Sequence, residues 1–269
     1  MKKLLFVIFL LIFYSQVRGS EWYLKPNLRY HTPLTYQSMP GYFSAQVFVP
    51  VYTLATPWTV VDINRKFSLA HGLSYGMSVG CFFNDLLGIE MMYDRFGISE
   101  TYQSDYPDIE EPYIVGKSDW KFTSNKLITS VVFRRSYGLK HEFLARAGVL
   151  IGINSIYKKI YGRGVSNAYD VNGGIGYGYN LGFEYRYELL DRIAVFAELG
   201  IENQFYSPTS ASLSQASYQL AMVDIIEYQK EYYRYNDPVY YDVYYQLKEH
   251  VKLNSLYVGF GLVFKLSEL

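Results

Sequence analysis

The chain has 269 residues, with 25 Lys and Arg against 25 Asp and Glu, so its formal net charge is zero. This length allows one large β domain or two small domains. The neutral balance argues against nucleic acid as a partner, because no basic field is available to displace counterions. The 30 tyrosines and 17 phenylalanines favour strands and the boundary between water and hydrocarbon in a membrane. A single cysteine, Cys81, excludes an internal disulfide, and we expect it to be a small lipid-facing side chain.

The N-terminal residues 1–19 have the features of a secretory signal peptide. A charged start and a short apolar run are followed by Val17 and Gly19, at positions suited to cleavage. The apolar run is shorter than the roughly 20 residues that a membrane-spanning helix needs. We therefore predict a signal peptide over 1–19 and a single β domain over 20–269, the architecture of which follows from its strands.

The stretch 171–190 sets the pattern for the rest of the chain. From Ile175 to Tyr187 every second residue is apolar or aromatic, and Gly, Asn or a single charge lies between them. A period of two predicts a strand with one bulky face and one small or charged face. The stretch is long enough to cross a bilayer, since a tilted strand needs roughly 9–11 residues. Similar stretches predict strands over 21–31, 67–83, 87–98, 120–135, 141–155, 171–190, 192–205 and 251–266.

The connections between these predicted strands alternate between long and short. The long ones cover 32–66, 99–119, 156–170 and 206–250, and the short ones cover 84–86, 136–140 and 189–191. An even number of strands, with short turns at one rim and long loops at the other, is typical of a bacterial outer-membrane barrel. The predicted fold class is all-β: a closed eight-stranded antiparallel up-and-down transmembrane barrel, with short periplasmic turns and long extracellular loops.

A soluble barrel of the lipocalin kind would also alternate, with its apolar side chains inside. In 67–83 and 171–190 the small face consists mostly of Gly, Ser and Asn, and glycine on a water-exposed strand would weaken it and cover nothing. We therefore expect the bulky face to meet lipid and the small face to meet the barrel axis. Unpaired charges inside would cost several kcal/mol each, so we expect ion pairs there. The candidates are Glu90, Asp94, Glu142, Arg146, Glu184, Arg186, Arg192, Glu198 and Glu202, with Arg29 and Lys265 as further partners.

The strand layout and the alternating C-terminal segment "LYVGFGLVFKL" resemble the eight-stranded outer-membrane barrel families. These include the transmembrane domain of outer-membrane protein A, the small adhesion-linked barrels and the "outer membrane protein β-barrel domain" proteins of Bacteroidota-type bacteria. The last strand of such families often ends in an aromatic residue, whereas here the last aromatic is Phe264. The resemblance implies an outer-membrane location, lipid as a partner and a monomer.

The sequence also bears on three other activities: transport, catalysis and metal binding. An interior of eight strands is just wide enough for side chains, which argues against a general porin and leaves passage of a small hydrophobic ligand as an alternative. An enzyme acting on lipid A or peptides would need a base near the outer rim, where His31 and His250 begin or end neighbouring strands. No Ser or carboxylate is fixed beside them by spacing. The acidic segment 104–112 matches no calcium loop. We predict no catalytic residue, no metal and no cofactor.

The long connection 206–250 is rich in tyrosine, which provides a large contact area at low entropic cost. These residues can form a binding surface, or they can continue the strands above the membrane as part of an aromatic girdle. The candidates for loop interactions are Tyr228, Tyr232, Tyr233, Tyr235, Tyr240, Tyr241, Tyr244 and Tyr245. The predicted function is a structural or surface-interaction role in the outer membrane, with an extracellular protein or glycan as the partner of the loops.

Overall fold

The computed structural model of the chain describes residues 21–38, 66–104, 116–162, 165–216, 225–229, 243–247 and 251–266. Its strands are β1 (Glu21–Pro33), β2 (Gln37–Ser38), β3 (Lys66–Phe67), β4 (Gly72–Phe82), β5 (Leu87–Ser104), β6 (Gly116–Tyr137), β7 (His141–Gly162), β8 (Val165–Asn172), β9 (Gly176–Leu190), β10 (Ile193–Tyr206), β11 (Ser210–Ala216), β12 (Ile225–Gln229), β13 (Val243–Leu247) and β14 (Val251–Leu266). No helix in these ranges is long and apolar enough to cross a membrane.

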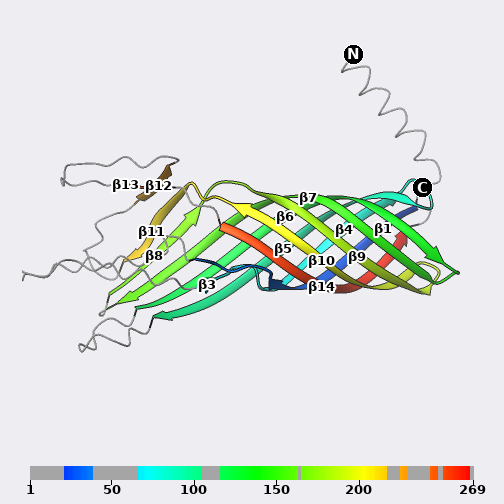
Figure 1. Cartoon of the computed structure of the whole chain (residues 1–269), viewed down its shortest axis with the longest axis horizontal. Coiled ribbons are helices and arrows are strands. Elements are labelled where there is room, and N and C mark those ends of the chain that lie inside the picture. The colour runs from blue at the N-terminus through cyan, green and yellow to red at the C-terminus, as the bar shows by residue number, and fades with distance from the viewer. Residues whose placement is uncertain are drawn as a thin grey trace, which may run out of the picture.

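Eight of the strands form a closed antiparallel barrel, as predicted. The order around the wall is β1, β4, β5, β6, β7, β9, β10 and β14, and the ring closes because β1 pairs with β14 and β7 pairs with β9. The strands are strongly tilted, and β8, β11, β12 and β13 lie beyond one end of the barrel (Figure 1). We call this the long-loop end. The opposite, short-turn end carries the start of β1 and the end of β14.

The side chains of the barrel wall have the predicted orientation. Bulky residues such as Tyr75, Tyr177 and Phe183 point outward and are exposed. The positions between them point to the axis and are small, charged or amide-bearing, as at Asn180 and Glu184, which are buried. The period of two therefore separates an apolar outer surface from a polar interior.

Glycine on the inner face makes room for large side chains that cross the lumen. A Cβ atom at Gly80 would collide with the ring of Tyr23, and one at Gly200 would collide with the hydroxyl of Tyr257. Both tyrosines are almost completely buried. The small residues thus provide the space in which the interior is packed, which is the role that a narrow barrel requires.

The strands extend further at the long-loop end than the sequence predicts. β5 and β6 remain paired up to Ser104 and Gly116, and β7 and β8 up to Gly162 and Val165, so that parts of the predicted loops 99–119 and 156–170 belong to strands. The outward residues here are polar, as at Lys121 and Lys159. The prediction located strands by their outward-facing apolar residues. It could not detect these extensions, because their backbone groups are hydrogen-bonded between strands while their outward side chains are polar.

β8 and β9 are two parts of one path along the edge of β7, separated by a double glycine. β9 pairs with β7 as far as Gly152, and β8 takes over from Ile156. Gly173 and Gly174 between them have φ values of 79° and 74°, a left-handed conformation that favours glycine. A Cβ atom at Gly174 would also collide with the carbonyl of Ser207, so the junction is closely packed.

The prediction that the second wall strand begins at residue 67 is wrong. β4 begins at Gly72, whose φ of 129° turns the chain inward, so residue 67 and those after it do not continue the wall. Leu69, predicted to face lipid, is fully buried inside the barrel end. Cys81 is also buried rather than lipid-facing, with 2% of its surface exposed. The strand pattern could not indicate either burial, because both depend on neighbouring segments.

Candidate functional site

A layer of charged side chains crosses the middle of the lumen. We call it the ionic layer; it consists of Lys25, Arg29, Glu90, Arg146, Glu184, Arg186 and Glu198. The Nζ atom of Lys25 lies 3.0 Å from a carboxylate oxygen of Glu90 and 2.9 Å from one of Glu184. Five separate strands contribute to this layer, which ties opposite walls of the barrel together.

Each glutamate of the ionic layer meets more than one cation. Glu184 contacts Lys25, Arg146 and Arg186. Glu198 contacts Arg29 and lies 2.9 Å from Nη1 of Arg146. All of these side chains are buried. The geometry compensates the large desolvation cost of burying the charges, which a single isolated pair would not achieve.

Two smaller ionic groups flank this layer. Toward the long-loop end, Lys126 bridges Asp94 at 3.0 Å and Glu202 at 2.6 Å. At the short-turn end, Lys265 lies 3.1 Å from Glu188 and 3.4 Å from Glu142. The structure therefore brings every predicted lumen candidate into an ion pair except Arg192, which pairs with no charged side chain in the described part of the chain.

Arg192 lies outside the interior. It is exposed in the short turn between β9 and β10, where its carbonyl accepts a hydrogen bond of 2.9 Å from the backbone of Lys265. The prediction for this residue was wrong because the strand begins only at Ile193, and the alternation was extended one residue too far into the turn.

Sequence reasoning missed Lys126 and Arg134, both on β6. Arg134 lies 2.6 Å from Glu21, close to the short-turn end. The inner face of β6 mixes these cations with the buried apolar residues Ile128 and Val132, which hides the separation of polar and apolar faces. The signal was their parity: both are an even number of positions from the inward-facing serines of the same strand.

Apolar side chains fill the lumen on both sides of the charges. Toward the short-turn end they are Tyr23, Phe82, Val132, Leu144, Ala194, Phe196 and Val263. Toward the long-loop end is a set that we call the mouth core: Leu69, Ala70, Phe96, Trp120, Phe122, Ile156, Val171, Tyr206, Val251 and Leu253. The described interior is thus packed at three levels, as expected for eight strands.

Lys158 extends from β7 at the edge of the mouth core. Its Nζ atom lies 4.9 Å above the ring of Trp120, a cation–π distance. Burial disfavours the charged ammonium and lowers the pKa of Lys158 to about 7. This lysine lies beyond the apolar outer rows, next to the hairpin formed by β7 and β8.

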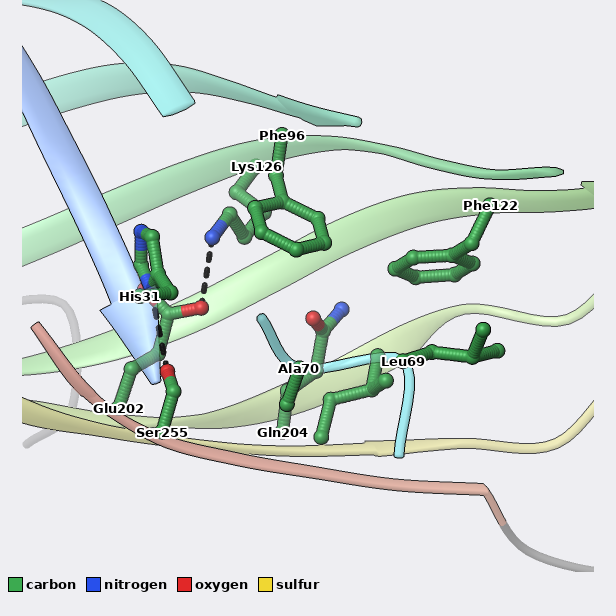
Figure 2. Close-up of a pocket in the computed structure, with 10 residues that line it drawn as sticks. His31, Leu69, Ala70, Phe96, Phe122, Lys126, Glu202, Gln204 and Ser255 are labelled. Atoms are coloured by element: carbon green, nitrogen blue, oxygen red, sulfur yellow. Dashed lines mark hydrogen bonds and ion pairs between the residues drawn. The ribbon is translucent and has the colours of Figure 1, made fainter. Parts of the chain in front are cut away.

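A small cavity lies between the mouth core and the ionic groups, with space for about one water molecule. Figure 2 shows its walls, with Phe96 and Phe122 on one side and Leu69 and Ala70 on the other. His31 closes the bottom of the cavity. Its Nδ1 lies 3.0 Å from the hydroxyl of Ser255, and its Nε2 lies 2.9 Å from that of Ser74.

The described histidines lie in separate parts of the barrel. His31 touches two serines and is buried in the interior, and its expected partner His250 lies outside the described residues. His71 pairs at 2.6 Å with Glu100 at the long-loop end, and His141 lies 2.8 Å from the hydroxyl of Tyr185 at the short-turn end. His31 is best understood as a hydrogen-bonded packing residue that links β1, β4 and β14.

The predicted loop residues are only partly described. Tyr228 lies in β12, and Tyr244 and Tyr245 lie in β13, which pairs with β12 in parallel. The other tyrosine candidates lie outside the described residues, as does nearly all of the acidic segment 104–112. Within the described ranges, no group of three or more His, Cys, Asp or Glu side chains could hold a metal ion.

Comparison with known proteins gives distant structural likenesses alone. No protein-family model and no curated protein sequence matches the chain. The attachment invasion locus protein Ail of Yersinia pestis is 11% identical over 91% of this chain and 97% of its own, with a TM-score of 0.32. CarO2 of Acinetobacter baumannii is 12% identical over 91% and 99%, with a TM-score of 0.34. CarO of the same species is 16% identical over 71% and 92%, with a TM-score of 0.32. Likenesses this distant carry no argument about function.

Proposed function

We propose that the chain is an integral β-barrel protein of the bacterial outer membrane with a structural or surface-interaction role. The observation that carries this proposal is the band of bulky side chains that points outward from every wall strand. In water such a band would be an exposed apolar patch far larger than monomeric proteins tolerate. In a membrane it is the surface that lipid requires, and closure of the sheet leaves no edge unpaired in hydrocarbon.

The height of the band fits an outer membrane. Aromatic residues border it at both ends, with Tyr137, Phe143 and Tyr185 in ring contact near the short turns and Tyr177 toward the long-loop end. On β9 the span from Tyr177 to Tyr187 is about 25 Å along the membrane normal, for roughly 3.3 Å per residue and a strand tilt of about 40°. Aromatic rings at this spacing are the girdles expected at the two interfaces.

The filled interior favours interaction over transport. Three packed levels separate the two ends of the described lumen, and the ionic layer alone would have to break several buried pairs to admit an ion. The strands instead continue beyond the band at the long-loop end, where β5 to β8 and β11 form a projecting sheet. This sheet, with the tyrosine-rich segment, would face the outside and contact an extracellular protein or glycan.

The location can be tested by membrane fractionation followed by electrophoresis. We expect the chain in the outer-membrane fraction and a different migration before and after heating, because a closed barrel resists the detergent until it is heated. Recovery from the soluble periplasm would contradict the proposal.

The surface role can be tested on cells that carry the full chain. Replacing Tyr228, Tyr244 and Tyr245 by serine should lower adhesion to glycan-coated or protein-coated surfaces at least severalfold, while heat-modifiable migration stays the same. A matched variant replaces Tyr137, at the short-turn end, and should adhere as the unmodified chain does. Equal adhesion of all three chains would leave only the structural role.

A further inference from the structure

The side chain of Leu69 fills the interior of the barrel at the long-loop end, although this residue does not belong to a wall strand. Its side chain is completely buried in the mouth core with Phe96, Phe122 and Leu253, and all four residues line the cavity. Figure 2 shows Leu69 across the cavity from Phe96 and Phe122. Leu69 itself lies in no strand. Among the residues that the structure describes, no backbone–backbone hydrogen bond joins Leu69 or the neighbouring Ala70 to the wall.

The segment that carries Leu69 has few polar contacts with the barrel wall, although Ser68, Leu69 and Ala70 are all buried and β3, just before them, pairs with β2. The hydroxyl of Ser68 accepts a hydrogen bond of 3.2 Å from the backbone of Ala70. His71, about one third exposed, pairs with Glu100 at 2.6 Å. Gly72, whose φ of 129° favours glycine, then begins β4. These contacts are local or solvent-exposed, so withdrawing the leucine does not disturb the barrel ladder.

The remaining walls of the cavity are fixed. His31, Phe96, Phe122, Lys126 and Ser255 come from wall strands β1, β5, β6 and β14, whose registers are continuous at these positions. The site would therefore keep its shape when Leu69 leaves. A pre-formed apolar pocket with a few polar groups at its base is the usual form of a small-molecule site.

The bottom of the pocket holds a carboxylate oxygen with no hydrogen-bond donor among the described residues. The carboxylates of Asp94 and Glu202 both contact the ammonium of Lys126, and Asp94 also interacts electrostatically with Arg29. Glu202 is buried and lines the cavity, and its Oε2 atom has no hydrogen-bond partner in the described part of the chain. Such an atom favours a hydrogen-bond donor, and a cationic donor most strongly.

We propose that the mouth of the barrel is a binding site for small amphiphilic amines, and that Leu69 is its internal competitor. The apolar end of the ligand takes the place of the Leu69 side chain between Phe96 and Phe122. The amine lies below it and donates to Glu202. The surface-interaction role neither requires nor predicts this site, so the two proposals can fail separately.

The test uses the full chain in detergent micelles, with 2-phenylethylamine as the probe. The methyl NMR signals of Leu253, which lines the pocket, report occupancy. Ethylbenzene and 3-phenylpropionate serve as neutral and anionic probes of similar shape. Because all variants share the same micelles, partitioning of the probes into detergent cancels when the chains are compared.

We expect saturable binding of the amine to the unmodified chain and at least tenfold tighter binding to Leu69→Ala, since the competitor is gone. Leu69→Met keeps the pocket filled and should bind within about threefold of the unmodified chain. Glu202→Gln should weaken binding of the amine about tenfold or more and leave that of ethylbenzene unchanged. Should Leu69→Ala lose heat-modifiable migration, Leu69→Val makes the same comparison.

Three results would overturn the proposal: no saturable shift of Leu253 in the unmodified chain, equal affinity of Leu69→Ala and the unmodified chain, or binding of 3-phenylpropionate as tight as that of the amine.

Discussion

The ionic layer and the mouth core fill the same lumen by opposite means. In the ionic layer each glutamate contacts two or three cations, as Glu184 does with Lys25 and Arg146 from other strands and with Arg186 from its own strand. In the mouth core the contacts are apolar and non-directional, and two members, Leu69 and Ala70, lie in no strand. Apolar packing tolerates a change of shape at moderate cost, whereas a charge network fails when one member is removed. The charged centre of the barrel therefore fixes which side chains meet, whereas the apolar mouth core can repack when one side chain changes.

The largest effect is expected from the ionic layer. Glu184→Gln keeps the shape of the side chain but leaves three buried cations short of a counter-charge, and should lower the free energy of unfolding by about 3–5 kcal/mol. Urea titration of the barrel in lipid vesicles would measure this. The control is Glu188→Gln, whose partly exposed pair with Lys265 should be worth at most about 1 kcal/mol. Equal losses of unfolding free energy in the two variants would contradict the expected difference between the ionic layer and the short-turn end.

The mouth core should respond less strongly. Phe122→Ala removes a buried ring, and we expect a loss of about 3 kcal/mol, because the unpaired segment around Leu69 can move into part of the space. Phe122→Leu, which keeps most of the volume, should cost about 1 kcal/mol in the same titration. A loss larger than that of Glu184→Gln would reverse the ranking of the two regions.

The mouth core should also make the stability of the barrel depend on pH, because the ionisable side chain of Lys158 is buried at its edge. Its folded-state pKa of about 7 lies below the unfolded value of 10.5, so the unfolded chain binds more protons between these values. Stability should therefore rise with pH across this window, by at most about 1.4 kcal/mol per unit, and should change little below pH 7 or above 10.5, where both states carry the same charge on this side chain. Lys158→Met should remove this slope in urea titrations at several pH values. A slope unchanged by the substitution would assign it to other groups.

The smallest effect is expected at Arg192, which belongs to neither region. Arg192→Ala should change the unfolding free energy by no more than about 0.5 kcal/mol, because the side chain is exposed in a turn. A loss comparable to that of Glu184→Gln would mean that the arginine reaches the lumen after all.

The wall was predictable because each of its strands obeys one rule over many residues. The row from Ile175 to Tyr187 repeats with a period of two, and a one-residue error would have turned the whole row inward. The inner charges on β9 and β10 followed from the same parity. The rule also yields the pairing of the first and last strands, since a barrel must close.

The mouth could not be predicted from such a rule. Leu69 fits the outward parity of β4, and only the turn at Gly72 directs it inside. Lys158 and Trp120 lie on strand extensions whose outer residues are polar, so the alternation gives no sign of a buried side. Which cation meets which glutamate is equally hidden, because register across the barrel depends on every intervening strand.

The glycine pair at 173–174 separates the projecting hairpin of β7 and β8 from the barrel wall, so the hairpin can change its length while the wall stays the same. Below this junction β7 is committed to β9, and above it the same edge belongs only to the hairpin with β8. Inserting two residues beside Gly162 and two beside Val165, beyond the last pair of β6 and β7 at Tyr161, would raise the hairpin tip by roughly 7 Å while every register in the ring is preserved. The reach of the protein beyond the polymers around a cell could therefore be adjusted by insertions that the membrane-embedded part never experiences.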